Sequence, residues 1–153
     1  MKHFLLDTGP LAAYLHNRPT VVERLTPLIK EHSVATSVLV YAKLMEYLHG
    51  FPDVAQRQAT LRLVLREISP YLLTYSILER YAILRRQLRP PHGSGLIGDI
   101  DTFIAATALE RGLTLITSDT DFMRVSHLSI ELLNLKTGEV KHIPETFEPI
   151  REF

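Results

Sequence analysis

The chain has 153 residues, of which 46% are hydrophobic and 22% charged, and these values predict one globular domain with a substantial core. It contains no cysteine, which excludes a disulfide framework, a thiolate zinc site, an iron–sulfur cluster and a cysteine nucleophile. Basic and acidic side chains number 17 each, so the net charge of zero does not by itself indicate a nucleic-acid partner.

The first apolar stretch, Phe4–Leu6, is too short for a signal peptide. No apolar run approaches the length of about 18 residues that is typical of a membrane span. We therefore expect a soluble, cytoplasmic protein without a membrane partner.

Short apolar strands alternate with amphipathic helices in the first half of the chain. A strand is predicted at Phe4–Leu6, and Pro10 is typical of the first position of the helix that follows. The spacing of Thr20 and Glu23 predicts a capping box for a second helix. The remaining elements predicted here are a strand at 33–37, helices at 38–49 and from 53 to 65, and an edge strand at 68–74.

The second half continues the alternation. Ser76 and Glu79 predict another capping box, for a helix that ends before a loop rich in proline and glycine at 90–95. A helix at Asp99–Arg111 is expected to end at Gly112. Strands at 113–117 and 128–133 and a hairpin turn at 136–139 follow. The residues expected on the inner face of the Asp99–Arg111 helix are Ile100, Phe103, Ile104, Ala108 and Leu109.

This order of elements predicts a three-layer α/β/α fold with a mainly parallel central sheet. We expect residues 1–153 to form a single domain, which ends in a short hairpin or tail from about residue 134.

Five of the six aspartates fall at three predicted strand ends or helix starts, namely Asp7, the pair Asp99 and Asp101, and the pair Asp119 and Asp121. The carboxyl ends of strands in an open α/β sheet form a binding crevice, so these carboxylates are expected to converge. Clustered oxygen ligands without cysteine favour Mg²⁺ or Mn²⁺ over zinc. For any single aspartate, a turn or helix cap explains its position equally well.

The chain resembles the PIN-domain ribonucleases, and within them the VapC-type toxins of toxin–antitoxin pairs. The resemblance rests on the residues at 5–11 (LLDTGPL), 97–106 (IGDIDTFIAA) and 115–122 (LITSDTDF). It implies that Asp7, Asp101 and Asp119 hold one or two divalent ions. Such ions activate water for hydrolysis of RNA phosphodiester bonds.

Other polar residues near these motifs are candidates for supporting roles. Possible supporting residues are Glu46, Asp99, Asp121, Thr8 and Ser118. Of these, the hydroxyls of Thr8 and Ser118 would hold carboxylates or phosphate oxygens in place.

One position departs from the family pattern. Lys43 stands where the resemblance predicts a glutamate, between Thr36–Ser37 and Leu44. Three explanations are open: Glu46, one turn along the helix, substitutes for the missing acid; the nuclease is impaired or silenced; or Lys43 itself fills a cation position. We favour impairment, because a base beside a dication repels it.

The resemblance also implies partners. A cognate antitoxin and a second copy of the chain are expected to bind, and the arginines at 80, 85, 86 and 89 are candidates for contacts with RNA phosphates. Two other readings stay open. One is a catalytically inactive PIN-fold module that binds antitoxin or RNA, and the other, a receiver-like phosphorylation domain, fits the spacing of Asp101 and Asp119 poorly.

Overall fold

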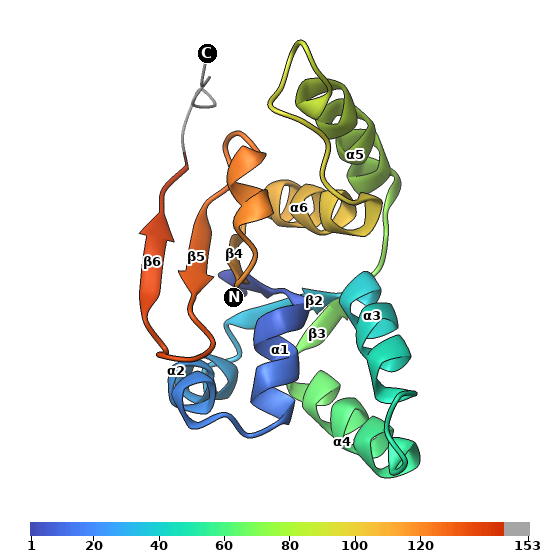
Figure 1. Ribbon diagram of the computed structural model, residues 1–153, viewed down its shortest axis with the longest axis vertical. Helices are drawn as coiled ribbons and strands as arrows, with labels where there is room; N and C mark the ends of the chain where they lie inside the picture. The colour runs from blue at the N-terminus through green and yellow to red at the C-terminus, as the bar shows by residue number, and fades with distance from the viewer. Residues whose placement is uncertain (146–153) are drawn as a thin grey trace.

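A computed structural model describes residues 1–145 and contains one six-stranded sheet with the order β3-β2-β1-β4-β5-β6 (Figure 1). All neighbouring strands are parallel except β5 and β6, which form an antiparallel hairpin. The end of the predicted tail, residues 146–153, lies outside the described residues. The bounds of the strands are β1 Phe4–Leu6, β2 Val34–Ser37, β3 Ser69–Tyr71, β4 Thr114–Thr117, β5 Ile130–Leu133 and β6 Val140–Ile143.

The helices lie on both faces of this sheet. In Figure 1, α1, α2 and α4 lie on one side and α5 and α6 on the other, which confirms the predicted three-layer fold. Among residues 1–145, no helix is long and apolar enough to cross a membrane. The bounds of the helices are α1 Thr8–Leu15, α2 Pro19–Lys30, α3 Val38–Leu48, α4 Val54–Glu67, α5 Tyr75–Leu88, α6 Asp99–Arg111 and the short 3₁₀ helix η1 Thr120–Arg124.

Both predicted capping boxes are wrong in detail. Helix α2 begins at Pro19, and its N-cap Arg18 makes no side-chain capping bond. Pro19 is sufficient to start this helix because proline fixes φ and lacks the N–H that the first turn leaves unpaired. Helix α5 is capped by Thr74, whose hydroxyl accepts a hydrogen bond from the amide of Ile77 at 3.3 Å.

The core lies on both faces of the central strands. Leu5 and Leu6 of β1 and Leu115 and Ile116 of β4 are fully buried. Because parallel strands covered by helices on both faces expose neither face, the central residues of these strands are apolar. One inward position of α6 is predicted wrongly: Ile100, in the first turn of the helix, is 40% exposed.

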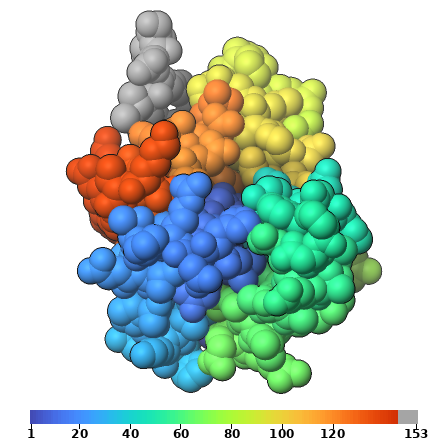
Figure 2. Space-filling view, turned by 60° about the horizontal axis from the view of Figure 1, so that its bottom comes forward, coloured from blue at the N-terminus to red at the C-terminus, as the bar shows by residue number. Residues whose placement is uncertain are grey.

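The sheet order places several chain segments around the end of β1. Strand β1 lies between β2 and β4, so the residues that follow these three parallel strands meet at one edge. Helix α3 follows β2 directly and contacts α1 and α6, and in the space-filling view of Figure 2 it borders both. Residues of β1, β4, α3 and α6 are therefore within reach of one another at this edge.

Candidate functional site

The site is built around Asp7, the residue that follows β1. Its amide donates to the carbonyl of Ile116 in β4 at 3.0 Å, and it occupies the N-cap position of α1. The side chain is buried, with 5% exposed. Its Oδ2 accepts a hydrogen bond from the Thr117 hydroxyl at 2.7 Å, whereas its buried Oδ1 has no hydrogen-bond partner among the described residues.

Thr117 connects the end of β4 to Asp7. The Thr117 Oγ1 donates to Asp7 and accepts from the amide of Asp119 at 3.1 Å, so one hydroxyl links two of the predicted site segments. Thr117 is not among the site residues predicted from the sequence, which include the neighbouring Ser118 instead. A polar residue at the last, buried position of an otherwise apolar strand is the signal that was available.

Asp101 and Lys43 meet beside Asp7. Asp101 lies in the first turn of α6 and Lys43 in the middle of α3, and the Lys43 Nζ lies 3.4 Å from Asp101 Oδ1. The exposed fractions of the two side chains are 36% for Lys43 and 18% for Asp101. Lys43 therefore supplies positive charge to the carboxylate at the position where the family pattern has an acid.

Burial and the neighbouring charges act together on the pKa of Asp7. Burial raises the pKa of Asp7 above its usual value, and the nearby Asp101 charge raises it further. The Thr117 hydroxyl, the Thr8 amide and the Lys43 ammonium lower it in part. The ionised form of Asp7 is thus held in the folded protein at a cost in free energy, which a bound cation would offset.

Asp119 lies two residues after Thr117, and one of its carboxylate oxygens forms a local hydrogen bond. Its Oδ1 accepts a hydrogen bond from the amide of Asp121 at 2.8 Å, which caps the short helix η1. Ser118 is exposed and lies against Gly9, where an added Cβ would come within 2.5 Å of the Ser118 Oγ. Glycine at position 9 therefore lets the start of α1 approach the end of β4 closely.

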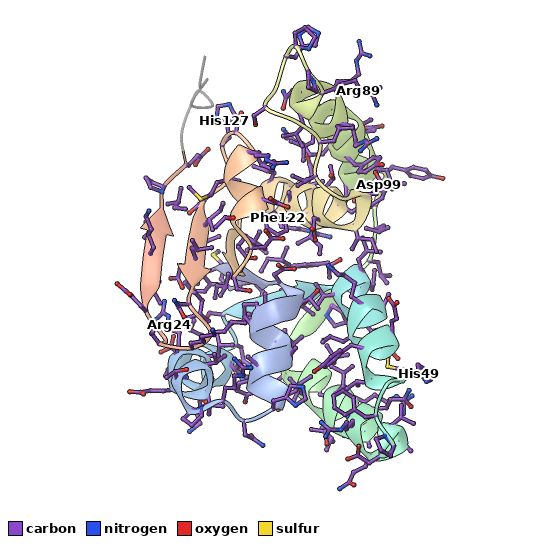
Figure 3. The ribbon with its side chains drawn as sticks, viewed as in Figure 1. Arg24, His49, Arg89, Asp99, Phe122 and His127 are labelled. Atoms are coloured by element: carbon purple, nitrogen blue, oxygen red, sulfur yellow. The ribbon has the colours of Figure 1, made fainter. Side chains whose placement is uncertain are left out.

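The other candidates for support divide into two groups. Asp99 interacts with α5, where its Oδ1 lies 2.8 Å from the Tyr81 hydroxyl and 3.2 Å from Arg85, and Figure 3 shows it where α6 begins beside α5. Asp121 pairs with Arg124 at 3.7 Å. These two carboxylates are held by neighbours outside the Asp7 cluster.

Thr8 and Glu46 form the second group. The Thr8 hydroxyl is buried next to Asp7 and has no hydrogen-bond partner among the described residues. Glu46 is exposed on α3 and makes no ion pair with the described part of the chain. Glu46 thus has no contact in the structure that would place it in the site.

Half of the arginines proposed for phosphate contacts are paired within the protein. Arg80 lies 2.8 Å from Glu110 and Arg85 lies 3.2 Å from Asp99, so both hold α5 against α6. Arg86 and Arg89 are exposed, and neither forms an ion pair with the described residues.

The donor set partly matches what a hard divalent cation requires. Asp7 and Asp101 offer carboxylate oxygens, and the unpartnered Oδ1 of Asp7 is a buried acceptor that a cation would satisfy. Within residues 1–145, no three carboxylate or imidazole groups are grouped closely enough to hold a metal. The Asp7–Asp101 pair therefore fits a cation, while the Lys43 ammonium works against tight binding.

The chain is similar to a known protein family and to several solved structures. The PIN domain family profile matches residues 4–128. No curated protein sequence matches the chain. Three solved structures are similar: VapBC2 from Rickettsia felis bound to a DNA fragment from their promoter, FitAcB from Neisseria gonorrhoeae, and VapBC-5 from Mycobacterium tuberculosis, a member of the VapBC family of toxin–antitoxin systems.

The three similarities cover most of each chain. For VapBC2 the TM-score is 0.75 with 25% identity, over 84% of this chain and 96% of that chain. For FitAcB the TM-score is 0.64 with 27% identity, over 76% of this chain and 88% of that chain. For VapBC-5 the TM-score is 0.55 with 24% identity, over 80% of this chain and 89% of that chain. This last similarity concerns the fold alone.

Proposed function

Because this chain belongs to the PIN domain family, we propose that it is a VapC-type toxin that hydrolyses RNA phosphodiester bonds in the cytoplasm with the help of Mg²⁺ or Mn²⁺. The resemblance drawn from the sequence motifs is confirmed at the level of the family. The observation that carries the nuclease proposal is the pairing of buried Asp7 with Asp101 at the carboxyl end of β1.

The proposed metal ligands are Asp7, Asp101 and Asp119. A divalent ion held there would lower the pKa of a bound water and offset the charge that develops on the phosphate. Asp7 is fixed for this role from two sides, because Thr117 holds its Oδ2 and the sheet holds its amide. Asp119 is proposed on the motif alone, since its carboxylate is bonded to the Asp121 amide.

The activity of this chain is proposed to be weak because of Lys43. The Lys43 Nζ lies 3.4 Å from Asp101 Oδ1, so the ammonium repels a dication that approaches the same oxygen. This contact also favours a second candidate function, a catalytically inactive PIN-fold module that binds antitoxin or RNA. The two candidates differ in whether the acidic pair takes up metal.

The proposed partners are a cognate antitoxin and a second copy of the chain. The antitoxin is supported by the similarity to VapBC2, at 25% identity.

A cleavage assay tests the nuclease proposal. The wild-type chain, Asp7→Asn and Lys43→Glu would each be incubated with single-stranded and structured RNA, in Mn²⁺ and in chelator. We expect weak, metal-dependent cleavage by the wild type, faster cleavage by Lys43→Glu and none by Asp7→Asn.

Cleavage by Asp7→Asn at the wild-type rate would refute the site. No cleavage by either the wild type or Lys43→Glu, together with no heat of Mn²⁺ binding to either, would favour the inactive binding module.

A further inference from the structure

Arg124 connects the two segments that carry the aspartates of the second half of the chain. It is the last residue of η1, three positions after Asp121. Its Nη1 donates a hydrogen bond to the carbonyl of Leu96 at 3.1 Å, and its Nη2 lies 3.7 Å from Asp121 Oδ1. One guanidinium therefore bridges η1 and the loop between α5 and α6, which descends between α5 and η1 in Figure 1.

On the loop side, the backbone that Arg124 holds leads directly to Asp101. Leu96 lies two residues before Gly98, which is the N-cap of α6. The Gly98 carbonyl accepts hydrogen bonds from both the amide and the hydroxyl of Thr102, each at 2.9 Å. The first turn of α6, to which Asp101 belongs, is thus fixed to the end of this loop.

On the other side, the hydrogen bonds of η1 lead to Asp119. The amide of Asp121 donates to Asp119 Oδ1 at 2.8 Å. The amide of Asp119 in turn donates to the Thr117 hydroxyl, which also holds Asp7. Phe122 is fully buried and anchors the same turn in the core. The η1 end of the bridge is therefore fixed as well, and a proposed metal ligand precedes it.

The geometry around the bridge suits an arginine. A guanidinium donates from several nitrogens in fixed directions, whereas a lysine ammonium is a single compact charge. The loop passes close to the guanidinium at Gly95, where an added Cβ would lie 3.9 Å from Arg124 Nη1. Gly95 has a φ of 130°, which favours glycine, and its amide donates to the Leu88 carbonyl at 2.9 Å. The loop is thus attached to α5 at Gly95 and to η1 at Leu96.

We propose that Arg124 is a positioning residue, which sets the placement of Asp101 relative to Asp119 by clamping the loop before α6 to η1. The inference rests on the proposed metal-dependent function, because these two aspartates are among its proposed ligands. The Arg124 side chain is 41% exposed, so its contacts should matter for local geometry more than for global stability.

Amide hydrogen exchange in the metal-free protein tests the clamp itself. Arg124→Ala should speed exchange at the amides of Gly95, Thr102 and Asp121 about fivefold, because each is bonded within one of the two clamped segments. Exchange in the central strands and the midpoint of urea unfolding should stay close to their wild-type values.

Calorimetric titration with Mn²⁺ tests the positioning role, in the Lys43→Glu background where we expect the highest affinity. Adding Arg124→Ala should lower the affinity about tenfold, as is typical when a residue that orients metal ligands is lost. Arg124→Lys keeps the charge but can make only one of the two contacts, so it should fall between. Millimolar guanidinium chloride should restore part of the affinity of Arg124→Ala, and sodium chloride at equal ionic strength should not.

Arg62→Ala is the matched control. It removes an exposed arginine from α4, which lies on the other side of the sheet in Figure 1. Both the exchange rates and the Mn²⁺ affinity should equal those of the parent protein.

The two measurements separate the possible failures. Exchange in Arg124→Ala at the wild-type rates would show that no clamp exists. Faster exchange throughout the chain, or faster local exchange with unchanged Mn²⁺ affinity, would overturn the positioning role. Weaker RNA binding with both measurements unchanged would make Arg124 a phosphate contact instead. If Lys43→Glu itself binds no Mn²⁺, the proposed metal site and the positioning role fail together, and the exchange rates still show whether the clamp exists.

Discussion

Replacing Lys43 with glutamate should restore metal binding to the acidic pair. The Lys43 Nζ lies 3.4 Å from Asp101 Oδ1. At that separation two unit charges interact by about 5 kcal/mol at an effective dielectric constant of ~20, and by about 1 kcal/mol in water. Because the Lys43 side chain is 36% exposed, screening brings the interaction toward the lower value. The substitution removes this cation and adds a carboxylate, so Mn²⁺ affinity should rise at least about tenfold, or about 1.4 kcal/mol.

Isothermal titration calorimetry with Mn²⁺ measures this change directly. Lys43→Met separates the two contributions, because it removes the ammonium without adding a ligand, and it should fall between wild type and Lys43→Glu. Lys136→Glu makes the same change of charge on the exposed hairpin turn and should leave Mn²⁺ affinity unchanged.

The reasoning fails if wild type and Lys43→Glu bind Mn²⁺ equally well. It also fails if Lys136→Glu improves binding as much as Lys43→Glu does, because the effect would then come from net charge and not from the contact with Asp101.

Three further predictions concern the same side chains and one buried ion pair. The folded-state pKa of Asp7 is raised, so its contribution to stability is present below the unfolded pKa and is lost as pH rises through the folded pKa. Asp7→Asn should therefore raise the Tm by a few degrees at neutral pH. Calorimetry should show this gain shrinking as the pH falls toward 3.8, the ordinary pKa of an aspartate. Thr117→Val removes the hydrogen bond to Asp7 and should slow metal-dependent cleavage about tenfold. The free energy of unfolding should fall by only about 1 kcal/mol. Arg24→Met leaves buried Glu131, now 2.6 Å from Arg24, without its partner and should cost about 3 kcal/mol in urea unfolding, whereas Arg24→Met/Glu131→Met should recover most of that loss.

Much of the fold could be predicted, because in many segments the pattern of apolar and turn residues in the sequence agrees with the burial or turn that the folded chain has there. The apolar segments at 4–6 and 113–117 are strands because both of their faces are buried, and Gly112 ends α6 in a left-handed conformation with φ of 63°. Helix starts were less predictable, since a proline or a single threonine serves as well as a full capping box. Ile100 shows the same limit, because helical periodicity does not reveal which residues in the first turn of a helix are covered by neighbouring elements.

The site could be predicted in part. Asp7 and Asp101 come together because strand order brings their segments to one edge, and strand ends are recognisable in a sequence. The hydrogen bond from the Asp121 amide to the Asp119 carboxylate was not predicted, because an aspartate at a strand end can either bond a nearby backbone amide or serve as a ligand. The role of Thr117 depends on a contact across 110 residues of sequence, which no local pattern encodes.

The central position of β1 has a consequence for synthesis of the protein. Its neighbour β4 begins at Thr114, so an emerging chain that has exposed only its first hundred residues lacks one of the two strands that enclose β1. Thr117, whose hydroxyl holds Asp7, has not emerged from the ribosome at that stage. The Asp7 site therefore forms only after most of the chain has left the ribosome.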